Sequence, residues 1–127
     1  MAGLVMNVVD YVVHEMLLPQ AWADAVKARG VEMAATQTAT MVGWIIVDFA
    51  LGLLLVWIYA GMRPRFGAGP KTALLASFAV WGIGHLVFAS YGFMGFLPWS
   101  LVVGATVGGF VAVFAAGLAG CWLYQES

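Results

Sequence analysis

Five polar side chains interrupt the apolar segments of this chain, and their types could do chemistry. Asn7, Asp10 and His14 are spaced three and four residues apart, which places them on one face of a helix. Asp48 and His85 each fall near the middle of a later apolar segment. Carboxyl and imidazole groups exchange protons, and imidazoles also bind metals and haem. These five residues are therefore the candidate polar core.

The composition indicates that this core lies in a membrane. Of the 127 residues, 64% are hydrophobic and 9% are charged, and the mean hydropathy is +0.98. Soluble domains are about 45–50% apolar and about 25% charged. A soluble chain of this length has too little interior to bury the excess. The net charge of −1 provides no basic surface for nucleic acid, and the single cysteine, Cys121, allows no intramolecular disulfide.

The hydropathy pattern predicts an all-α fold, a single integral membrane four-helix bundle. We expect spans at about residues 3–18, 40–62, 72–96 and 98–124, and a short interfacial helix at about 19–30. Pro19 suits a first helical turn, Gly30 a C-terminal cap, and Trp22 an anchor at the membrane interface. The first span is about 24 Å long at 1.5 Å per residue, short for a hydrocarbon core of about 30 Å.

The basic residues predict the orientation. The turn between the second and third spans carries Arg63, Arg65 and Lys71 and no acid. The positive-inside rule places this turn in the cytoplasm, and with four spans both termini lie there too. The same three bases can contact lipid headgroups.

Two features predict how the helices pack. Residues 41–61 align with residues 106–126 without a gap and share eight identities, among them Gly43 with Gly108 and Tyr59 with Tyr124. A duplication would relate two helical hairpins by a pseudo-two-fold axis along the membrane normal; shared rules of packing and aromatic belts are the alternative explanation. In the fourth span, small residues at every fourth position form a ridge for a close neighbour, namely Gly104, Gly108, Ala112, Ala116 and Gly120. We expect packing within the chain at this ridge, with a homo-oligomer as the alternative.

The stretch from Trp57 to Ala73 reads W-I-Y-A-G-M-R-P-R-F-G-A-G-P-K-T-A. It resembles a group of small, uncharacterised bacterial membrane proteins of four helices, in which a W-[LI]-Y segment runs into an R-P-R-F-G-x-G-P-K-T-A turn. Their W-L-Y-x-E motif matches Trp122 to Glu126. The resemblance implies a bacterial inner-membrane protein and transfers no activity or catalytic residue.

The leading functional hypothesis is a non-enzymatic membrane protein with a buried acid–His core. It would bind a hydrophobic small molecule or serve as an accessory subunit of a larger membrane complex, because aromatic side chains lie beside small-residue ridges. A charged group at mid-membrane costs about 2.5–3.5 kcal/mol, so we expect the acids and histidines to converge inside the bundle. Their simplest role is hydrogen bonding between helices, worth about 0.6 kcal/mol per contact.

Two alternatives remain open. The first is a proton- or ion-coupled transporter or channel that uses Asp10, Asp48 and His85. The second is a haem b protein in which His14 and His85 are the axial ligands; the absence of a C-x-x-C-H motif excludes covalent haem attachment. A metal site of two histidines and two aspartates has no close-spaced ligand motif behind it. No phosphate loop or nucleophile motif indicates an enzyme.

Overall fold

The computed structural model describes residues 1–30 and 37–124, and this part of the chain is all-helical, as predicted. Helix α1 (Ala2–Tyr11) continues into a π-helical segment, η1 (Val12–Leu17), and α2 (Pro19–Lys27) follows. The three long helices are α3 (Gln37–Phe66), α4 (Pro70–Phe93) and α5 (Trp99–Trp122). Helix α3 begins at Gln37, before the expected start of the second span at about residue 40.

Three described helices are long and apolar enough to cross a membrane, and they are α3, α4 and α5. This confirms the prediction of a membrane protein with spanning helices. The combined α1 and η1 segment covers only residues 2–17 and is shorter than these three. The first of the four expected spans, at about residues 3–18, therefore stays a prediction.

The turn between α3 and α4 is made by glycines and not by its first proline. We expected Pro64 to help break the helix, but α3 includes Pro64 and runs on to Phe66. Gly67 and Gly69 have φ values of +80° and +129°, which L side chains rarely adopt, and the chain reverses there. The backbone N–H of Gly69 donates a 3.1 Å hydrogen bond to the hydroxyl of Tyr59, which holds the turn against α3.

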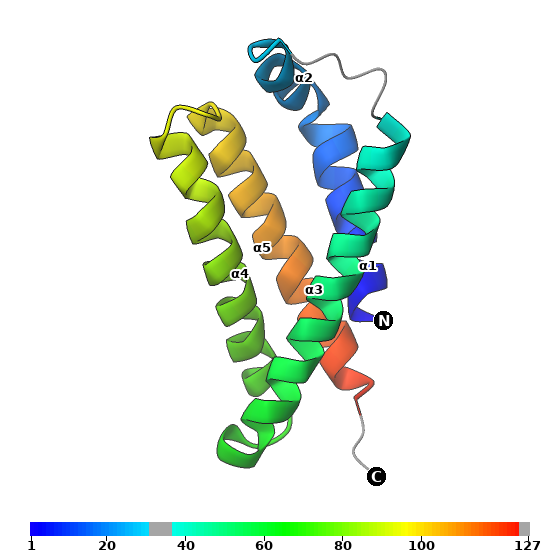
Figure 1. Ribbon diagram of the computed structural model, residues 1–127. Helices are drawn as coiled ribbons and strands as arrows, with labels where there is room; N and C mark the ends of the chain where they lie inside the picture. The colour runs from blue at the N-terminus through cyan, green and yellow to red at the C-terminus, as the bar shows by residue number, and fades with distance from the viewer. Residues whose placement is uncertain (31–36, 125–127) are drawn as a thin grey trace.

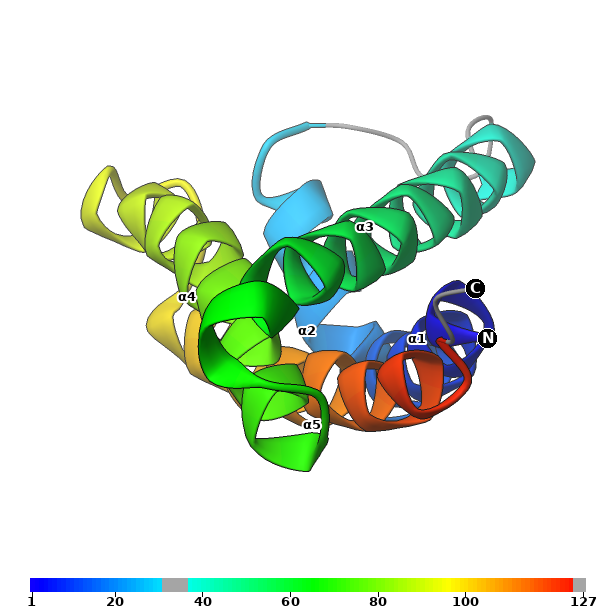
Figure 2. The same ribbon diagram turned by 90° about the horizontal axis from the view of Figure 1, so that it is seen from below.

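The helices are arranged around α5 (Figure 1). Helix α5 packs against α1 and α4, and α1 also packs against α3. Helices α3 and α4 meet at their shared turn and diverge toward the opposite end of the molecule in both views (Figure 2). Helix α2 lies at that opposite end with the link between α4 and α5. Helix α2, the predicted interfacial helix, and the basic turn are thus at opposite ends of the molecule, as the predicted topology requires.

Small residues on α5 allow the first segment, made of α1, η1 and Leu18, to pack closely against it. A β-carbon added at each of three ridge glycines would lie 2.4–2.9 Å from a side chain of the first segment; the pairs are Gly104 with Leu18, Gly108 with Val13 and Gly120 with Ala2. The ridge alanines between them, Ala112 and Ala116, are buried. The ridge therefore packs within the chain, as expected.

A second set of glycines on α5 faces α4. A β-carbon at Gly117 would lie 2.0 Å from the hydroxyl of Ser77, and one at Gly109 would lie 2.2 Å from Nε2 of His85. Helix α5 consequently has two glycine-lined faces, one for α1 and one for α4.

Helix α3 is buried only in its second half. Every residue from 38 to 47 is exposed, and Asp48 is the first buried residue of the helix. Further along, Leu55 and Tyr59 belong to the core together with Met6 of α1. The divergence from α4 therefore leaves the beginning of α3 uncovered (Figure 1).

Candidate functional site

Asp10 on α1 faces Asp48 on α3, and their carboxyl groups are close enough to interact. Asp48 is only 6% exposed. Two carboxylates offer only acceptor atoms, so a hydrogen bond between them requires one proton held by the pair. Without that proton, Oδ1 of Asp10 is a buried acceptor with no donor among the described residues. The pair is therefore a buried, protonatable contact between two helices.

Asn7 lies one turn before this pair and also joins the two helices. Its Nδ2 donates to the carbonyl oxygen of Gly3 at 2.9 Å and to that of Ile45 on α3 at 3.4 Å. Close approach at Gly52 makes this possible, because a β-carbon there would lie 2.4 Å from the nitrogen of Gly3. Asn7 and Asp10 are thus both turned toward α3, whereas His14, which the spacing places on the same face, contacts Trp22 of α2.

His14 lies in the π-helical segment and is held by Trp22. The indole Nε1–H of Trp22 donates a 2.9 Å hydrogen bond to Nδ1 of His14. The N–H of Leu18 reaches the carbonyl of Val13 across five residues at 2.9 Å, which widens the turn just before Pro19. Pro19 has no N–H and its ring crowds the preceding turn, which accounts for the wider helix at this position. A neutral imidazole that accepts at Nδ1 carries its proton on Nε2.

His85 lies between α4 and α5 in a space that Gly109 leaves open. Its ring packs 5.7 Å from the Trp81 ring and 6.3 Å from the Phe88 ring, centroid to centroid. Nδ1 of His85 is buried and has no hydrogen-bond partner within the described ranges. Trp81 fixes one wall of this space by donating from Nε1 to the carbonyl of Thr106 at 3.1 Å.

Ring contacts join the two histidines into one aromatic cluster. The Trp22 ring lies 5.7 Å from His14 and 6.4 Å from Phe88, and Phe88 in turn contacts His85. The two imidazoles are close enough to interact electrostatically. The structure thus brings His14 near His85 through side chains of α2 and α4.

The expected acid–His pairing is not formed in the part of the chain that the structure describes. The acids, Asp10 and Asp48, pair with each other, while the histidines have aromatic neighbours. Pairing with an acid requires an imidazole within reach, and the hydrogen bond to Trp22 and the space at Gly109 direct both imidazoles elsewhere. Among the described residues, no group of three or more His, Cys, Asp or Glu side chains could hold a metal ion.

The same geometry bears on haem ligation. An axial ligand supplies a lone pair from one imidazole nitrogen. Because Nδ1 of His14 accepts the Trp22 hydrogen bond, its Nε2 carries the proton and has no lone pair to offer. Ligation through Nε2 would require the proton to move to Nδ1 and the bond to Trp22 to break.

The three basic residues predicted to contact lipid headgroups differ in how exposed they are. Arg65 and Lys71 are exposed. Arg63 is partly buried, and its guanidinium lies 6.0 Å from the Tyr59 ring and 5.5 Å from the Tyr124 ring. Arg63 thus also packs the end of α3 against the end of α5.

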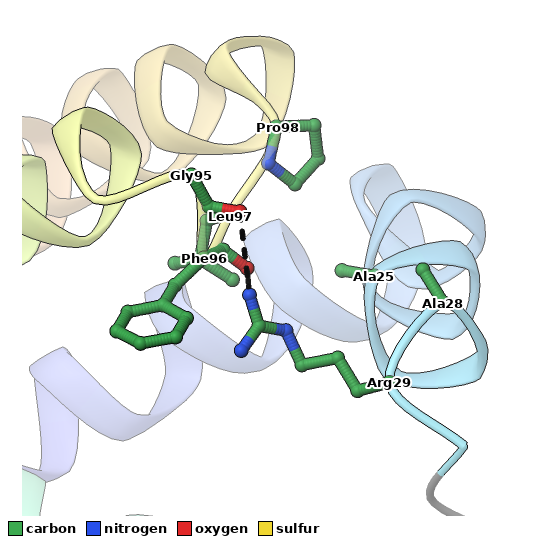
Figure 3. Close-up of a pocket in the computed structure, with 7 residues that line it drawn as sticks. All are labelled: Ala25, Ala28, Arg29, Gly95, Phe96, Leu97 and Pro98. Atoms are coloured by element: carbon green, nitrogen blue, oxygen red, sulfur yellow. Dashed lines mark hydrogen bonds between the residues drawn. The ribbon is translucent and has the colours of Figure 1, made fainter.

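Sequence reasoning missed a contact made by Arg29, at the end of α2 (Figure 3). Its Nη2 donates to the carbonyl oxygens of Gly95 and Phe96, and its guanidinium lies 4.5 Å from the Phe96 ring. The contact borders a hollow of about 350 Å³ whose lining residues are Ala25, Ala28, Arg29, Gly95, Phe96, Leu97 and Pro98. The only sequence signal was the glycine at 95, whose φ of +72° exposes these carbonyls. The contact ties α2 to the α4–α5 link.

The chain matches no known protein family, no curated protein and no solved structure. Its function is therefore argued from the geometry above.

Proposed function

We propose that this protein is a non-enzymatic inner-membrane protein that binds a hydrophobic partner against the first half of α3. The partner is an apolar small molecule or a membrane helix of a larger complex. One observation carries the proposal. The most apolar 18-residue stretch of α3 has a mean hydropathy of 2.3, but only 17% of it is buried inside the chain. The corresponding stretch of α5 has a mean hydropathy of 2.2 and is 50% buried.

The divergence of α3 from α4 supports this proposal. Large side chains along the uncovered stretch include Trp44, Ile45 and Ile46, which are 57%, 42% and 62% exposed. Aromatic side chains contribute large contact areas to binding surfaces, and exposed apolar patches mark interaction sites. A partner between the diverging helices would also lie beside α4, which carries Phe88 and His85 of the aromatic cluster.

A photo-crosslinking residue placed at position 44 tests the proposal in native membranes. We expect a defined adduct, a protein or a small apolar molecule, that mass spectrometry identifies. A probe at Val103 on α5 is the matched control, because Val103 has the same exposed fraction of 57%. Equal adducts with bulk phospholipid at both positions would count against the proposal.

Four spans, with both termini and the basic turn in the cytoplasm, complete the proposal. The two-hairpin repeat belongs to it as well. Helices α3 and α5 run in the same direction (Figure 1), and the equivalent residues Tyr59 and Tyr124 contact each other with ring centroids 6.0 Å apart. Such a contact is expected near a pseudo-two-fold axis.

The contact between Asp10 and Asp48 favours a second candidate function, proton-coupled transport. Buried carboxyl groups within membrane helices are typical of proton pathways. Proton flux in proteoliposomes should fall on Asp10→Asn and on Asp48→Asn and vanish in the double variant. Asp24→Asn is the control, since Asp24 is exposed on α2 and accepts a hydrogen bond from Gln20. Flux that survives in the double variant would exclude this function.

A further inference from the structure

The uncovered part of α3 is equivalent, in the internal alignment, to a part of α5 that is fully covered. The offset of 65 residues relates the α5 ridge to a row on α3: Ala39, Gly43, Val47, Leu51 and Leu55. The first segment, made of α1, η1 and Leu18, covers the α5 ridge from Leu18 at Gly104 to Ala2 at Gly120. The row on α3 is covered only at its end, where Leu55 is fully buried.

Gly43 shows the difference most directly. Its equivalent, Gly108, receives the side chain of Val13, and a β-carbon there would lie 2.4 Å from that side chain. A β-carbon at Gly43 would meet no atom within 4 Å. Ala39 and Val47, one turn to either side, are exposed as well. Helix α3 thus carries a seat for a neighbouring helix that is empty in this arrangement.

The repeat identifies the helix that fits this seat. Gly3 of α1 meets Gly52 on α3, and Ser77 of α4 meets the equivalent Gly117 on α5. The contact of α4 with α5 is therefore equivalent, in the repeat, to the contact of α1 with α3. Ser77 follows Gly3 by 74 positions, and the same spacing from Val13 leads to Val87.

Val87 is available for such a contact. It is 58% exposed, and its neighbours Ile83 and Leu86 on the same half of α4 are 67% and 75% exposed. These apolar side chains lie on the part of α4 that diverges from α3 (Figure 1). The row around Gly43 on α3 and the apolar side chains around Val87 on α4 are thus both uncovered in the same chain.

We propose that α3 and α4 close onto each other in a second state, with Val87 seated at Gly43. Helix α3 moves in this change. Helix α4 stays on α5, because His85 and Ser77 are inserted at Gly109 and Gly117 and Arg29 holds the α4–α5 link. In moving, the first half of α3 leaves its contact with α1, where the Asn7 hydrogen bond to Ile45 is 3.4 Å long and Asp48 meets Asp10. Movement of packed helices between two discrete arrangements is a common form of gating.

Cysteine cross-linking tests the closure. In a Cys121→Ser background, Gly43→Cys and Val87→Cys should form an intramolecular cross-link, seen as a monomer of altered mobility. The matched control pair is Trp44→Cys with Val87→Cys, because Trp44 is exposed but points about 100° away around the helix. We expect several-fold more cross-linking at 43–87 than at 44–87.

Three results would overturn the proposal. A covalent dimer through position 43 would mean that a second copy covers the seat. Equal cross-linking of the two pairs would indicate unspecific collision. Two thiols that both react with maleimide but never cross-link would show that α3 and α4 stay apart. Maleimide labelling reports on each thiol separately, and unfolding of each variant in detergent, compared with that of the Cys121→Ser chain, shows whether it has folded.

Discussion

A β-carbon added at Gly52 would lie 2.4 Å from the backbone nitrogen of Gly3, so α1 and α3 touch through their backbones. The polar contacts between these helices depend on this close approach. Both the Asn7 bond to Ile45 and the pairing of Asp10 with Asp48 lie along the same interface. A change that separates the two backbones should therefore also break the polar contacts of Asn7 and Asp10 with α3.

Gly52→Val should separate α1 from α3. Overpacking costs about 1–3 kcal/mol of unfolding free energy, and here the new atoms meet backbone, which yields little. Gly61→Val on the same helix is the control, because nothing lies within 4 Å of its β-carbon. Unfolding in detergent measures both variants, and equal stability of the two would contradict the observed packing.

Gly109→Ala should displace the imidazole of His85, which lies 2.2 Å from the position of the new β-carbon. We expect a loss of about 1–3 kcal/mol in unfolding free energy. The double variant Gly109→Ala with His85→Ala should recover part of this loss, because the alanine then fills the vacated space. Gly84→Ala is the control on α4, where a β-carbon meets open space. A double variant less stable than both single variants would argue against the contact.

If Asp10 and Asp48 pair, replacing Asp48 by asparagine and by alanine should change the unfolding free energy differently. In Asp48→Asn the amide N–H can donate to Asp10, so the unfolding free energy should be at least that of the natural chain. Asp48→Ala leaves Asp10 buried without its partner and should cost about 1–3 kcal/mol. Corresponding changes at the exposed Asp24 should stay within about 0.5 kcal/mol. Equal costs of the two Asp48 variants would show that the carboxyl groups do not pair.

Trp22→Phe removes the donor to His14 and keeps an aromatic ring. We expect a loss of about 0.5–1.5 kcal/mol, the usual net value of one hydrogen bond. Nitrogen NMR of the imidazole gives the specific readout: the natural chain should show the Nε2–H tautomer at His14, and the variant should lose this preference. Trp99→Phe is the control, since Trp99 is partly exposed and packs edge-on against Phe93. Strong Soret absorbance after haem is supplied to the natural chain would contradict this tautomer.

The predicted orientation can be tested by labelling single cysteines with an impermeant maleimide in intact cells, in a Cys121→Ser background. Gln20→Cys on α2 should react from outside, and Ala68→Cys in the basic turn should react only after lysis. Both positions are exposed, so access depends on the side of the membrane. Reaction of Ala68→Cys in intact cells would reverse the orientation. Labelling of both positions only after lysis would indicate that α3, the one long helix between them in the described part of the chain, does not cross the membrane.

Local patterns predicted much of the fold. Helical spacing identified the face that carries Asn7 and Asp10, and the four-residue spacing of small side chains identified the ridge on α5. The π-helical segment at His14 was not predictable in the same way, because it depends on how Pro19 and Leu18 are accommodated together. Pro64 was overrated as a helix breaker, since the helix continues through it to the glycine turn.

The candidate site shows where sequence reasoning reaches its limit. Polar spacing identified all five residues, but not which of them meet. The partner of His14 is Trp22 on another helix, and the place of His85 depends on Gly109 on α5. Such contacts depend on the rotation and axial position of each helix, which a single sequence does not encode locally.

The two glycine-lined faces of α5 have a consequence for biosynthesis. The helix that holds both α1 and α4 follows them in the chain, so during translation the earlier segments enter the lipid before their common support exists. Until residues 99–122 are inserted, the glycine contacts of α1 and α4 cannot form, and the nascent intermediate must rely on the α1–α3 interface and the α3–α4 turn.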